Sequence, residues 1–191
     1  MLVVPRRTER LLVRPLCPDD RAAFVAAMRA SAVLHAPWMP SRPPEADFDW
    51  LFDRQWEGHS TGRCCKLVAE LPDGMLAAFV NLNDIVRGVT ESCNAGWSVN
   101  ALVGGKGFAT EAVGALLDVA FGPAPEGLGL HRVAAGIMPE NLASLRVAQK
   151  CGFRVEGFAP KLIRIAGQWR DHVLLAKLAE EHEMRSVIDT Q

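Results

Sequence analysis

The chain has 191 residues, of which 49% are hydrophobic, so it is long enough to bury one substantial core and fits a single α/β domain. Its formal net charge of −1 provides no global positive field, so we expect neither direct nucleic-acid binding nor attraction to anionic lipid. Five cysteines without Cys-x-x-Cys spacing, and no His pair at metal-ligand spacing, predict reduced thiols of a cytoplasmic protein without a bound metal.

Charged residues interrupt the apolar positions of residues 1–16, so this segment lacks a signal-peptide core, and no later apolar run approaches membrane-spanning length. Residues 10–15 (Arg-Leu-Leu-Val-Arg-Pro) are typical of a short strand. Pro18-Asp-Asp20 then opens an alanine-rich stretch to about residue 29, and its acidic residues suit the first turn of a helix. We therefore expect a strand followed by a helix.

The next segment predicts a loop, a helix and a β-hairpin. Prolines make residues 35–44 unsuited to a regular element, whereas apolar residues recur at helical intervals over residues 45–57. Residues 66–71 and 75–82 have the composition of strands, and Pro-Asp-Gly at 72–74 is a strong turn between them. This hairpin places two antiparallel strands in the sheet.

The second half of the chain alternates strands and helices. The apolar residues from Phe108 to Phe121 form one broad helical face, which Gly122-Pro123 ends, and Gly152 is typical of a left-handed cap on a later helix. We expect helices at 108–121 and 140–150, and strands at 91–99, 131–138, 153–165 (interrupted near residue 160) and 172–178. This order mixes hairpins with parallel crossovers, so it predicts an α/β sheet of mixed pairing.

A glycine-rich turn, Gly104-Gly-Lys-Gly107, lies directly between a strand and the helix that begins at Phe108. Such a turn leaves backbone N–H groups free at the positive end of the helix dipole, where a phosphate or pyrophosphate binds. A P-loop would need Ser or Thr after Lys106, and a dinucleotide fingerprint would need glycine in place of Thr110. The turn predicts a single anion site, and its alternative is a plain strand-to-helix connection.

The segment Gly105–Ala112 resembles the acetyl-CoA pyrophosphate loop of the GNAT superfamily of N-acetyltransferases. Asn141–Ser144, together with Lys150–Gly157, resembles the helix-strand motif that follows it in that superfamily. Within the superfamily, the chain is most similar to the RimJ/RimL group, which acetylates N-terminal residues of ribosomal proteins. The segments similar to RimJ are Pro37-Trp38 and residues 81–88, 96–99 and 167–174.

The resemblance covers about residues 8–178, which implies one N-acetyltransferase domain there and terminal extensions at 1–7 and 179–191. The implied fold is α/β (α+β), with a mixed, twisted central sheet of about six or seven strands and flanking helices. The family's sheet is splayed at the acetyl-CoA site. We therefore expect two neighbouring strands to separate next to the glycine turn.

The resemblance also implies a binding site for acetyl-CoA as co-substrate, with no metal. The resemblance implies that the pyrophosphate of acetyl-CoA binds to the glycine turn and the first helical residues: Gly104, Gly105, Lys106, Gly107, Phe108 and Ala109. A backbone N–H near Val99, beside Ser98, bonds the acetyl oxygen in the family. Asn141 and Ser144 lie three residues apart on one helical face and reach the same ligand, and Ser144 serves the leaving sulfur.

Two departures from the family concern the cofactor side of the reaction. Leu102 occupies a position where the superfamily pattern has Gln or Arg, so one side-chain contact is missing. The chain has no tyrosine, the acid that many superfamily members use to protonate the leaving thiolate. We therefore expect Ser144 and Asn141 to carry the catalytic role on the donor side.

The acceptor side of the site has several candidate bases. The acid proposed as base in RimL-like enzymes aligns near Leu162-Ile163 and is absent. Asp84, Glu91 and Glu111 are alternative carboxylates, Asp171-His172 is a possible orienter and base, and proximity with proton relay through water is our default expectation. Trp38 and His172 are predicted to contact the acceptor, whereas Trp97 and Trp169 are predicted to pack the sheet.

Three functions follow from these features. The first is a cytoplasmic N-acetyltransferase, monomer or homodimer, that transfers acetyl directly from acetyl-CoA to the N-terminal α-amine of a ribosomal or other small basic protein. The second is acetylation of a small amine such as an antibiotic, a polyamine or an amino-acid conjugate. The third is a weakly catalytic acyl-CoA-binding regulatory protein, which the missing tyrosine suggests.

Overall fold

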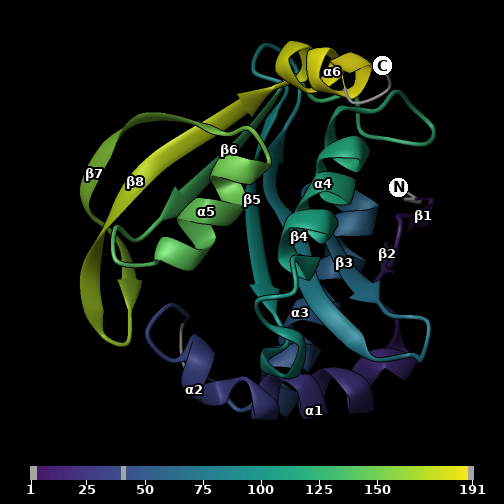
Figure 1. The fold of residues 1–191 in the computed structure, drawn as a ribbon, viewed down its shortest axis with the longest axis vertical. Helices are drawn as coiled ribbons and strands as arrows, with labels where there is room; N and C mark the ends of the chain where they lie inside the picture. The colour runs from purple at the N-terminus through teal and green to yellow at the C-terminus, as the bar shows by residue number, and fades with distance from the viewer. Residues whose placement is uncertain (1–3, 40–41, 189–191) are drawn as a thin grey trace.

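An open sheet of eight strands, in the order β1-β2-β3-β4-β5-β6-β8-β7, forms the centre of the molecule (Figure 1). The computed structural model describes residues 4–39 and 42–188, without the side chains of residues 54–60 and 184–188. Neighbouring strands are antiparallel, apart from the parallel pair β5 and β6. The predicted mixed sheet is confirmed, with one strand more than the sequence indicated.

The strands have these bounds: β1 Arg6–Arg7, β2 Leu12–Pro15, β3 Cys65–Glu70, β4 Leu76–Val86, β5 Ser92–Val99, β6 Arg132–Ile137, β7 Arg154–Ile165 and β8 Gln168–Leu178. The additional strand is β1, whose two arginines are too short a run to show any periodicity. β8 begins four residues before the predicted strand, because Ala166 and Gly167 both have positive φ and close a two-residue hairpin with β7.

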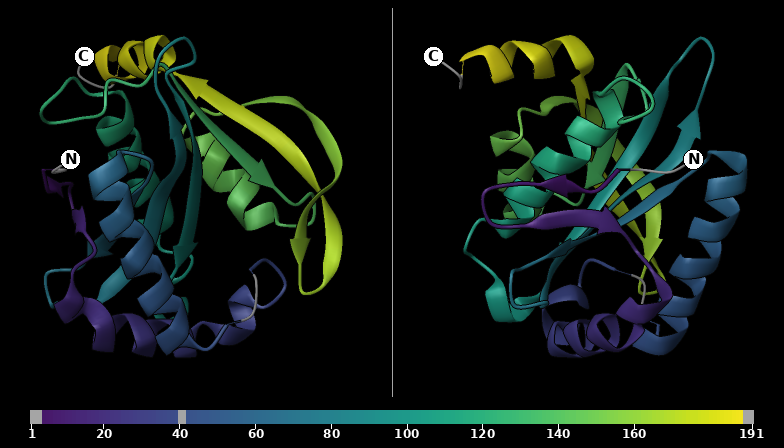
Figure 2. Two further views of the ribbon diagram at one scale, coloured as in Figure 1. Left: turned by 180° about the vertical axis from the view of Figure 1, so that it is seen from behind. Right: turned by 90° about the vertical axis from the view of Figure 1, so that its right-hand side faces the viewer.

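The helices cover both faces of the sheet (Figure 2), with α1 and α3 on one side and α4 and α5 on the other. Their bounds are α1 Arg21–Ala30, α2 Ala32–His35, α3 Pro44–Thr61, α4 Phe108–Phe121, α5 Leu142–Lys150 and α6 Ala179–Ile188, with single 3-10 turns at Pro18–Asp20 and Ala101–Val103. The single turn α2 lies between the two predicted helices. No helix in the described residues has both the length and the apolar character needed to cross a membrane.

Two hydrophobic cores hold the layers together. The larger core packs the buried face of α4, including Val113, Leu116 and Leu117, against the centre of the sheet. The smaller core lies under α1 and α3, where the ring of Phe24 meets that of Phe79 edge-on at 4.8 Å between centroids. Each large side chain buried in these cores contributes about 1.5–3 kcal/mol to folding, so both faces of the sheet are firmly covered.

The parallel strands β5 and β6 separate toward one end. Their pairing runs from Ser92 opposite Arg132 to Asn94 opposite Ala134, and no pairing follows in the described residues of either strand. The later residues of β5 remain paired with β4, as far as Val99 opposite Ala78. The wedge that opens between β5 and β6 confirms the predicted splay of the sheet, and it positions the candidate site.

Candidate active site

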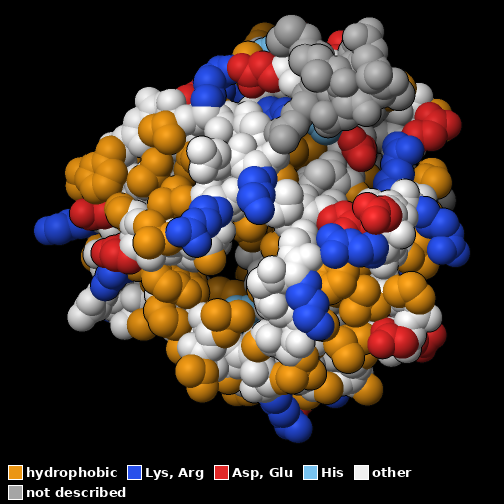
Figure 3. Space-filling model, viewed as in Figure 1, with side chains coloured by type: hydrophobic (Ala, Val, Ile, Leu, Met, Phe, Trp, Pro, Cys, Tyr) orange, Lys and Arg blue, Asp and Glu red, His pale blue; other side chains and the backbone are white. Residues whose placement is uncertain are grey.

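A cavity of about 470 Å³ occupies the wedge between β5 and β6. Its mouth is visible as a hollow among hydrophobic side chains in Figure 3. Most of the predicted site residues line this cavity: Trp38, Ser98, Val99, Gly105, Gly107, Phe108, Ala109, Asn141, Ser144 and His172. Gly104 and Lys106 are not among the lining residues. The fold thus brings together residues from β5, the glycine turn, α4, α5, β8 and the segment after α2.

The glycine turn meets one wall of this cavity at the N-terminus of α4. Gly105 and Gly107 have φ values of +77° and +86°, a backbone conformation that is strained for residues with a side chain. No side chain caps this helix, and within the described residues no acceptor takes the N–H groups of Phe108, Ala109 or Thr110. These free donors and the bare glycine backbone fit a pyrophosphate.

A network of polar contacts holds the glycine turn from the N-terminal side of the chain. Arg10 forms an ion pair with Glu111 in α4, donates to the carbonyl of Lys106 at 3.0 Å, and stacks over the ring of Phe108. Glu111 Oε1 also accepts from the hydroxyl of Thr8 at 2.5 Å. Burial raises the pKa of Glu111, but hydrogen bonds from Thr8 and Arg10 outweigh it and hold the pKa below its ordinary value.

The carboxylates that the sequence offered as general bases lie outside the cavity. Glu111 belongs to the network with Arg10, and Glu91 accepts from the backbone N–H of Gly88 at 2.9 Å. Asp84 is exposed and accepts a long contact of 3.4 Å from Asn94. None of these three carboxylates is among the residues that line the cavity.

The end of β5 presents its backbone to the wedge. Successive N–H groups of a strand point to opposite sides, and the N–H of Asn100 bonds to the carbonyl of Ala77 on the β4 side. The N–H and C=O of Val99 therefore face away from β4, into the wedge, where β6 no longer pairs with β5. The carbonyl of Val99 accepts from His35, and its N–H is directed toward the same space.

Asn141 and Ser144 both line the cavity at the start of α5, but their side chains differ in what they bond. Asn141 is the N-cap of α5, and its Oδ1 accepts from the backbone N–H of Ser144 at 3.1 Å. The hydroxyl of Ser144 has no hydrogen-bond partner among the described residues. Its donor is therefore available to a ligand in the cavity.

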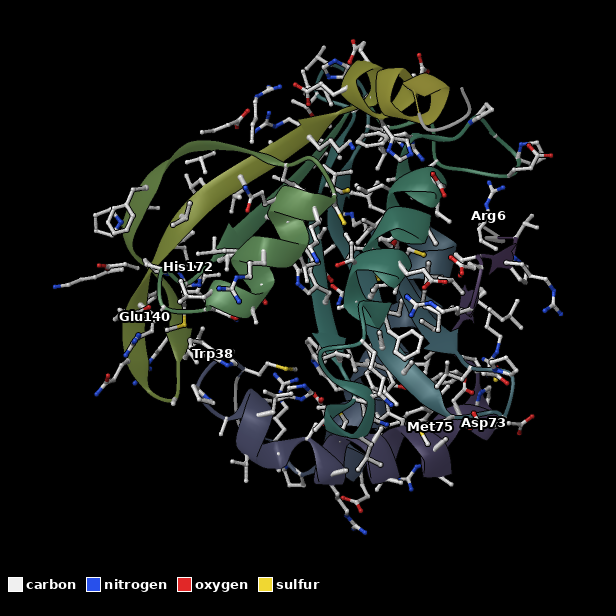
Figure 4. The ribbon with its side chains drawn as sticks, viewed as in Figure 1. Arg6, Trp38, Asp73, Met75, Glu140 and His172 are labelled. Carbon is white, nitrogen blue, oxygen red and sulfur yellow. The ribbon has the colours of Figure 1, made fainter. Side chains whose placement is uncertain are left out.

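Two histidines line the cavity, and the sequence singled out one of them. His172 in β8 is 2% exposed, and its Nδ1 lies 3.0 Å from the carbonyl oxygen of Arg170. The predicted Asp171-His172 pair is not formed, because Oδ1 of Asp171 instead accepts from the backbone N–H of Lys161 at 2.7 Å. Figure 4 shows His172 beside Trp38 and Glu140, where β8 faces the segment after α2.

The second histidine, His35, is a residue that the sequence did not indicate. It ends α2, is 8% exposed, and its Nε2 lies 2.9 Å from the carbonyl oxygen of Val99. Since a carbonyl only accepts, Nε2 carries the proton, and the buried Nδ1 has no partner among the described residues. Burial lowers the pKa of His35 and outweighs the hydrogen bond to Val99, so the ring is neutral at pH 7.

The two tryptophans that were predicted to pack the sheet behave differently. Trp97 in β5 packs against Phe153 with 6.1 Å between ring centroids, and it also lines the cavity with a buried indole N–H that has no partner in the described part of the chain. Trp169 in β8 is 60% exposed, so the prediction that it packs the sheet was wrong. It lies at the tip of the β7–β8 hairpin, which extends beyond the sheet's covering helices.

Known proteins are similar to this chain over most of its length. The Acetyltransferase (GNAT) domain family matches residues 10–154. An Escherichia coli [ribosomal protein uS5]-alanine N-acetyltransferase is 31% identical over 180 residues, which cover 88% of each chain. The Bacillus subtilis protein YjcK, named a probable N-acetyltransferase, is 42% identical over 111 residues, 58% of this chain and 59% of its own length.

A solved structure of a similar protein also shares this fold. A solved structure of Mycobacterium smegmatis RimJ in complex with CoA-disulfide superimposes with a TM-score of 0.84 at 28% identity, over 98% of this chain and 94% of that one. The eight-stranded sheet, splayed beside a glycine turn at a helix N-terminus, agrees with the family match. The chain belongs to the GNAT acetyltransferase family and is an N-acetyltransferase.

Proposed function

We propose that this enzyme transfers acetyl from acetyl-CoA directly to the N-terminal α-amine of a ribosomal or similar protein. The observation that supports this acceptor is that no carboxylate is among the described residues that line the cavity, whose titratable groups are His35, Arg146, Lys150 and His172. Such a lining offers no carboxylate to pair with the several positive charges of a polyamine. The same lining suits an amine whose single positive charge is lost easily.

The acid–base chemistry of amines favours the same acceptor. An α-amine has a pKa near 7.7–8.0, so about a tenth of it is neutral at pH 7, whereas a lysine side chain near 10.4 is almost wholly charged. Only the neutral form can attack a thioester. An N-terminal amine therefore needs modest help from the site, and the similarity to the E. coli alanine N-acetyltransferase supports this choice.

On the donor side, we assign acetyl-CoA to the wall formed by the glycine turn, α4 and α5. The backbone N–H groups from Gly104 to Ala109 would hold the pyrophosphate, and the cations Arg146 and Lys150 would add favourable charge. The bound thioester supplies an activated acetyl group. The N–H of Val99, beside Ser98, would stabilise negative charge on the acetyl oxygen, and the hydroxyl of Ser144 would donate to the leaving sulfur.

The acceptor is tested by measuring thiol release from acetyl-CoA with a basic peptide that begins with alanine, and by locating the acetyl group by mass spectrometry. The control is the same peptide with a blocked N-terminus and free lysines. A panel of spermidine, aminoglycosides and aminoacyl conjugates tests the small-amine alternative. We expect turnover with the free N-terminus and none with the blocked one.

Two other results would decide against this proposal. Turnover with small amines but none with the peptide would assign the enzyme to small-molecule acetylation. Tight CoA binding without turnover on any amine would favour the weakly catalytic binding protein.

A further inference from the structure

A hydrogen bond within its own strand determines which ring nitrogen of His172 carries the proton. Its Nδ1 lies 3.0 Å from the carbonyl oxygen of Arg170, and a carbonyl oxygen only accepts. In the neutral ring, Nδ1 therefore carries the proton and Nε2 carries a lone pair. Nε2 has no hydrogen-bond partner among the described residues, although His172 is 2% exposed and lines the main cavity. An oriented lone pair that faces the cavity without a partner suits a proton acceptor.

The ring also lies next to the wedge where the sheet opens. A Cβ placed on Gly136 of β6 would be 3.7 Å from Cδ2 of His172, so the imidazole packs over the bare backbone of this strand. Gly136, Ser144 and the end of β5 at Val99 line the same cavity. An amine that reaches the proposed acetyl position near Val99 would therefore be within the space that His172 borders.

A second cavity, of about 350 Å³, provides an approach to this space. It shares Trp38, Met138 and Ile165 with the main cavity, so the two adjoin. Its other walls include Glu140 and Arg170, which form an ion pair of 3.3 Å at its edge. No residue of the glycine turn lines the second cavity, so an acceptor that enters there would not cross the proposed donor wall.

The charged groups around His172 come from every neighbouring element. Those that line the two cavities are His35 at the end of α2, Arg146 and Lys150 on α5, Glu140 before α5 and Arg170 on β8. Asp171 is adjacent to His172 in β8, and Lys161 and Arg164 lie on β7, which pairs with β8. Glu140 is paired with Arg170, and Asp171 accepts from the backbone of Lys161. Both histidines that line the cavity carry an unpartnered lone pair in the neutral ring, but Nδ1 of His35 is fully buried, whereas Nε2 of His172 is not among the buried atoms and is open to the cavity.

We propose that Nε2 of His172 takes a proton from the ammonium of the acceptor, which arrives through the second cavity. This inference rests on the proposed transfer to an amine. The neutral nitrogen then bonds to the acetyl carbonyl carbon, the carbon–sulfur bond breaks, and the second proton of the nitrogen passes to the departing sulfur to give the thiol. The imidazolium returns its proton to solvent, so the net products are the amide, CoA and one proton.

The test compares His172→Gln, which removes the basic lone pair, with His131→Gln as matched control. His131 is an exposed histidine immediately before β6, outside the lining of both cavities, and it pairs with Glu180. For each variant, kcat/KM for the alanine peptide is measured from pH 6 to pH 10, together with the Kd for acetyl-CoA. We expect His172→Gln to lower kcat/KM by about 10²-fold at pH 7 without changing the Kd for acetyl-CoA.

The pH profile separates a proton acceptor from a structural residue. The deficit of His172→Gln should shrink above pH 9, because solvent then supplies the neutral amine. A loss of equal size at every pH, in a variant with wild-type melting temperature, would identify a structural role. Activity within threefold of wild type at all pH values would also overturn the proposal.

A second measurement requires no turnover. NMR of the imidazole nitrogens at pH 7.5, in protein with CoA bound, should show the tautomer protonated on Nδ1 and a change at Nε2 when the peptide is added. The tautomer protonated on Nε2 would overturn the assignment of His172 while leaving the acetyltransferase function intact. If the wild-type enzyme acetylates no amine while the Nδ1–H tautomer is present, the proposed function fails and this inference falls with it.

Discussion

At the scale of single residues, the start of α5 divides two roles between two neighbouring polar side chains. The side-chain oxygen of Asn141 caps the helix by accepting a hydrogen bond from the backbone N–H of Ser144. The hydroxyl of Ser144 is left for the cavity. The structure therefore supports a helix cap for Asn141 and makes Ser144 the better candidate for contact with the leaving sulfur.

Replacement of Ser144 by alanine tests this role. We expect Ser144→Ala to lower kcat by about 10- to 10²-fold, because the thiolate loses a hydrogen-bond donor that acts while charge develops on sulfur. The Kd for CoA should stay within about twofold, since the pyrophosphate contacts remain. Isothermal titration and steady-state kinetics measure the two quantities. Ser92→Ala, on β5 outside the cavity, is the control, and an unchanged kcat in Ser144→Ala would remove the residue from the mechanism.

At the scale of elements, α4 is the helix whose N-terminus forms the proposed pyrophosphate cradle. Three features keep that end open: the left-handed Gly107 as N-cap, the absence of a side-chain cap, and Arg10, which ties the turn and Glu111 together. The cradle therefore depends on contacts from the N-terminal strands as well as on its own glycines.

Gly107→Val tests the cradle itself. Valine at a φ of +86° costs about 1–3 kcal/mol of strain, and its side chain would also cover the backbone that the ligand approaches. We expect the affinity for CoA to fall at least about tenfold in protein that still folds. Gly114→Val, in the middle of the same helix and with open space at its Cβ, is the matched control and should bind CoA normally. Wild-type affinity in folded Gly107→Val would place the pyrophosphate elsewhere.

Glu111→Gln tests the network that supports the turn. Loss of this charged acceptor should lower the free energy of unfolding by about 1–2 kcal/mol at pH 7. Because the folded-state pKa of Glu111 lies below its ordinary 4.5, the stabilisation is complete above that value and is lost as pH falls toward the folded pKa. Urea unfolding between pH 3 and pH 7 should show this loss in wild type and a weaker one in the variant. Exposed Glu9→Gln is the control, and equal acid sensitivity of Glu111→Gln and wild type would contradict the prediction.

At the scale of the whole molecule, His35 connects the two sides of the cleft. It joins the end of α2 to the carbonyl of Val99 in β5, residues that are 64 positions apart. This contact fixes the segment that carries Trp38 against the strand that presents the proposed oxyanion donor. The buried, neutral ring of His35 therefore helps to fix the acceptor wall and the donor wall of the cavity relative to each other.

His35→Gln tests this connection through pH, because glutamine can donate to Val99 but does not titrate. The folded-state pKa of His35 is below its ordinary 6.5. As pH falls below 6.5, His35 therefore becomes protonated in the unfolded chain while it stays neutral in the folded protein, which favours unfolding. Wild type should therefore lose stability between pH 7.5 and pH 5, and His35→Gln should lose less. Melting temperatures across this range, with exposed His131→Gln as control, measure the difference. Parallel curves for wild type and His35→Gln would mean that His35 is protonated without cost.

The sequence by itself determined the elements whose signals are local. Helical periodicity and a glycine stop predict α4, turn residues predict the β3–β4 hairpin, and consecutive glycines predict an open helix N-terminus. These signals arise between residues a few positions apart, so they are present before the chain folds. The family resemblance depends on the same short segments, which is why the fold and the proposed donor side could be expected from them.

Only the tertiary structure decided which distant residues meet. Arg10 reaches Glu111 across 101 positions, and His35 reaches Val99 across 64, and no periodicity encodes such contacts. The Asp171-His172 pair looked like a dyad because the residues are adjacent, yet successive side chains of a strand point to opposite faces. The order of the strands and the wedge between β5 and β6 placed His172 in the cavity and Glu111 outside it. Which residues form the acceptor side of the site therefore depends on how the strands assemble into the sheet.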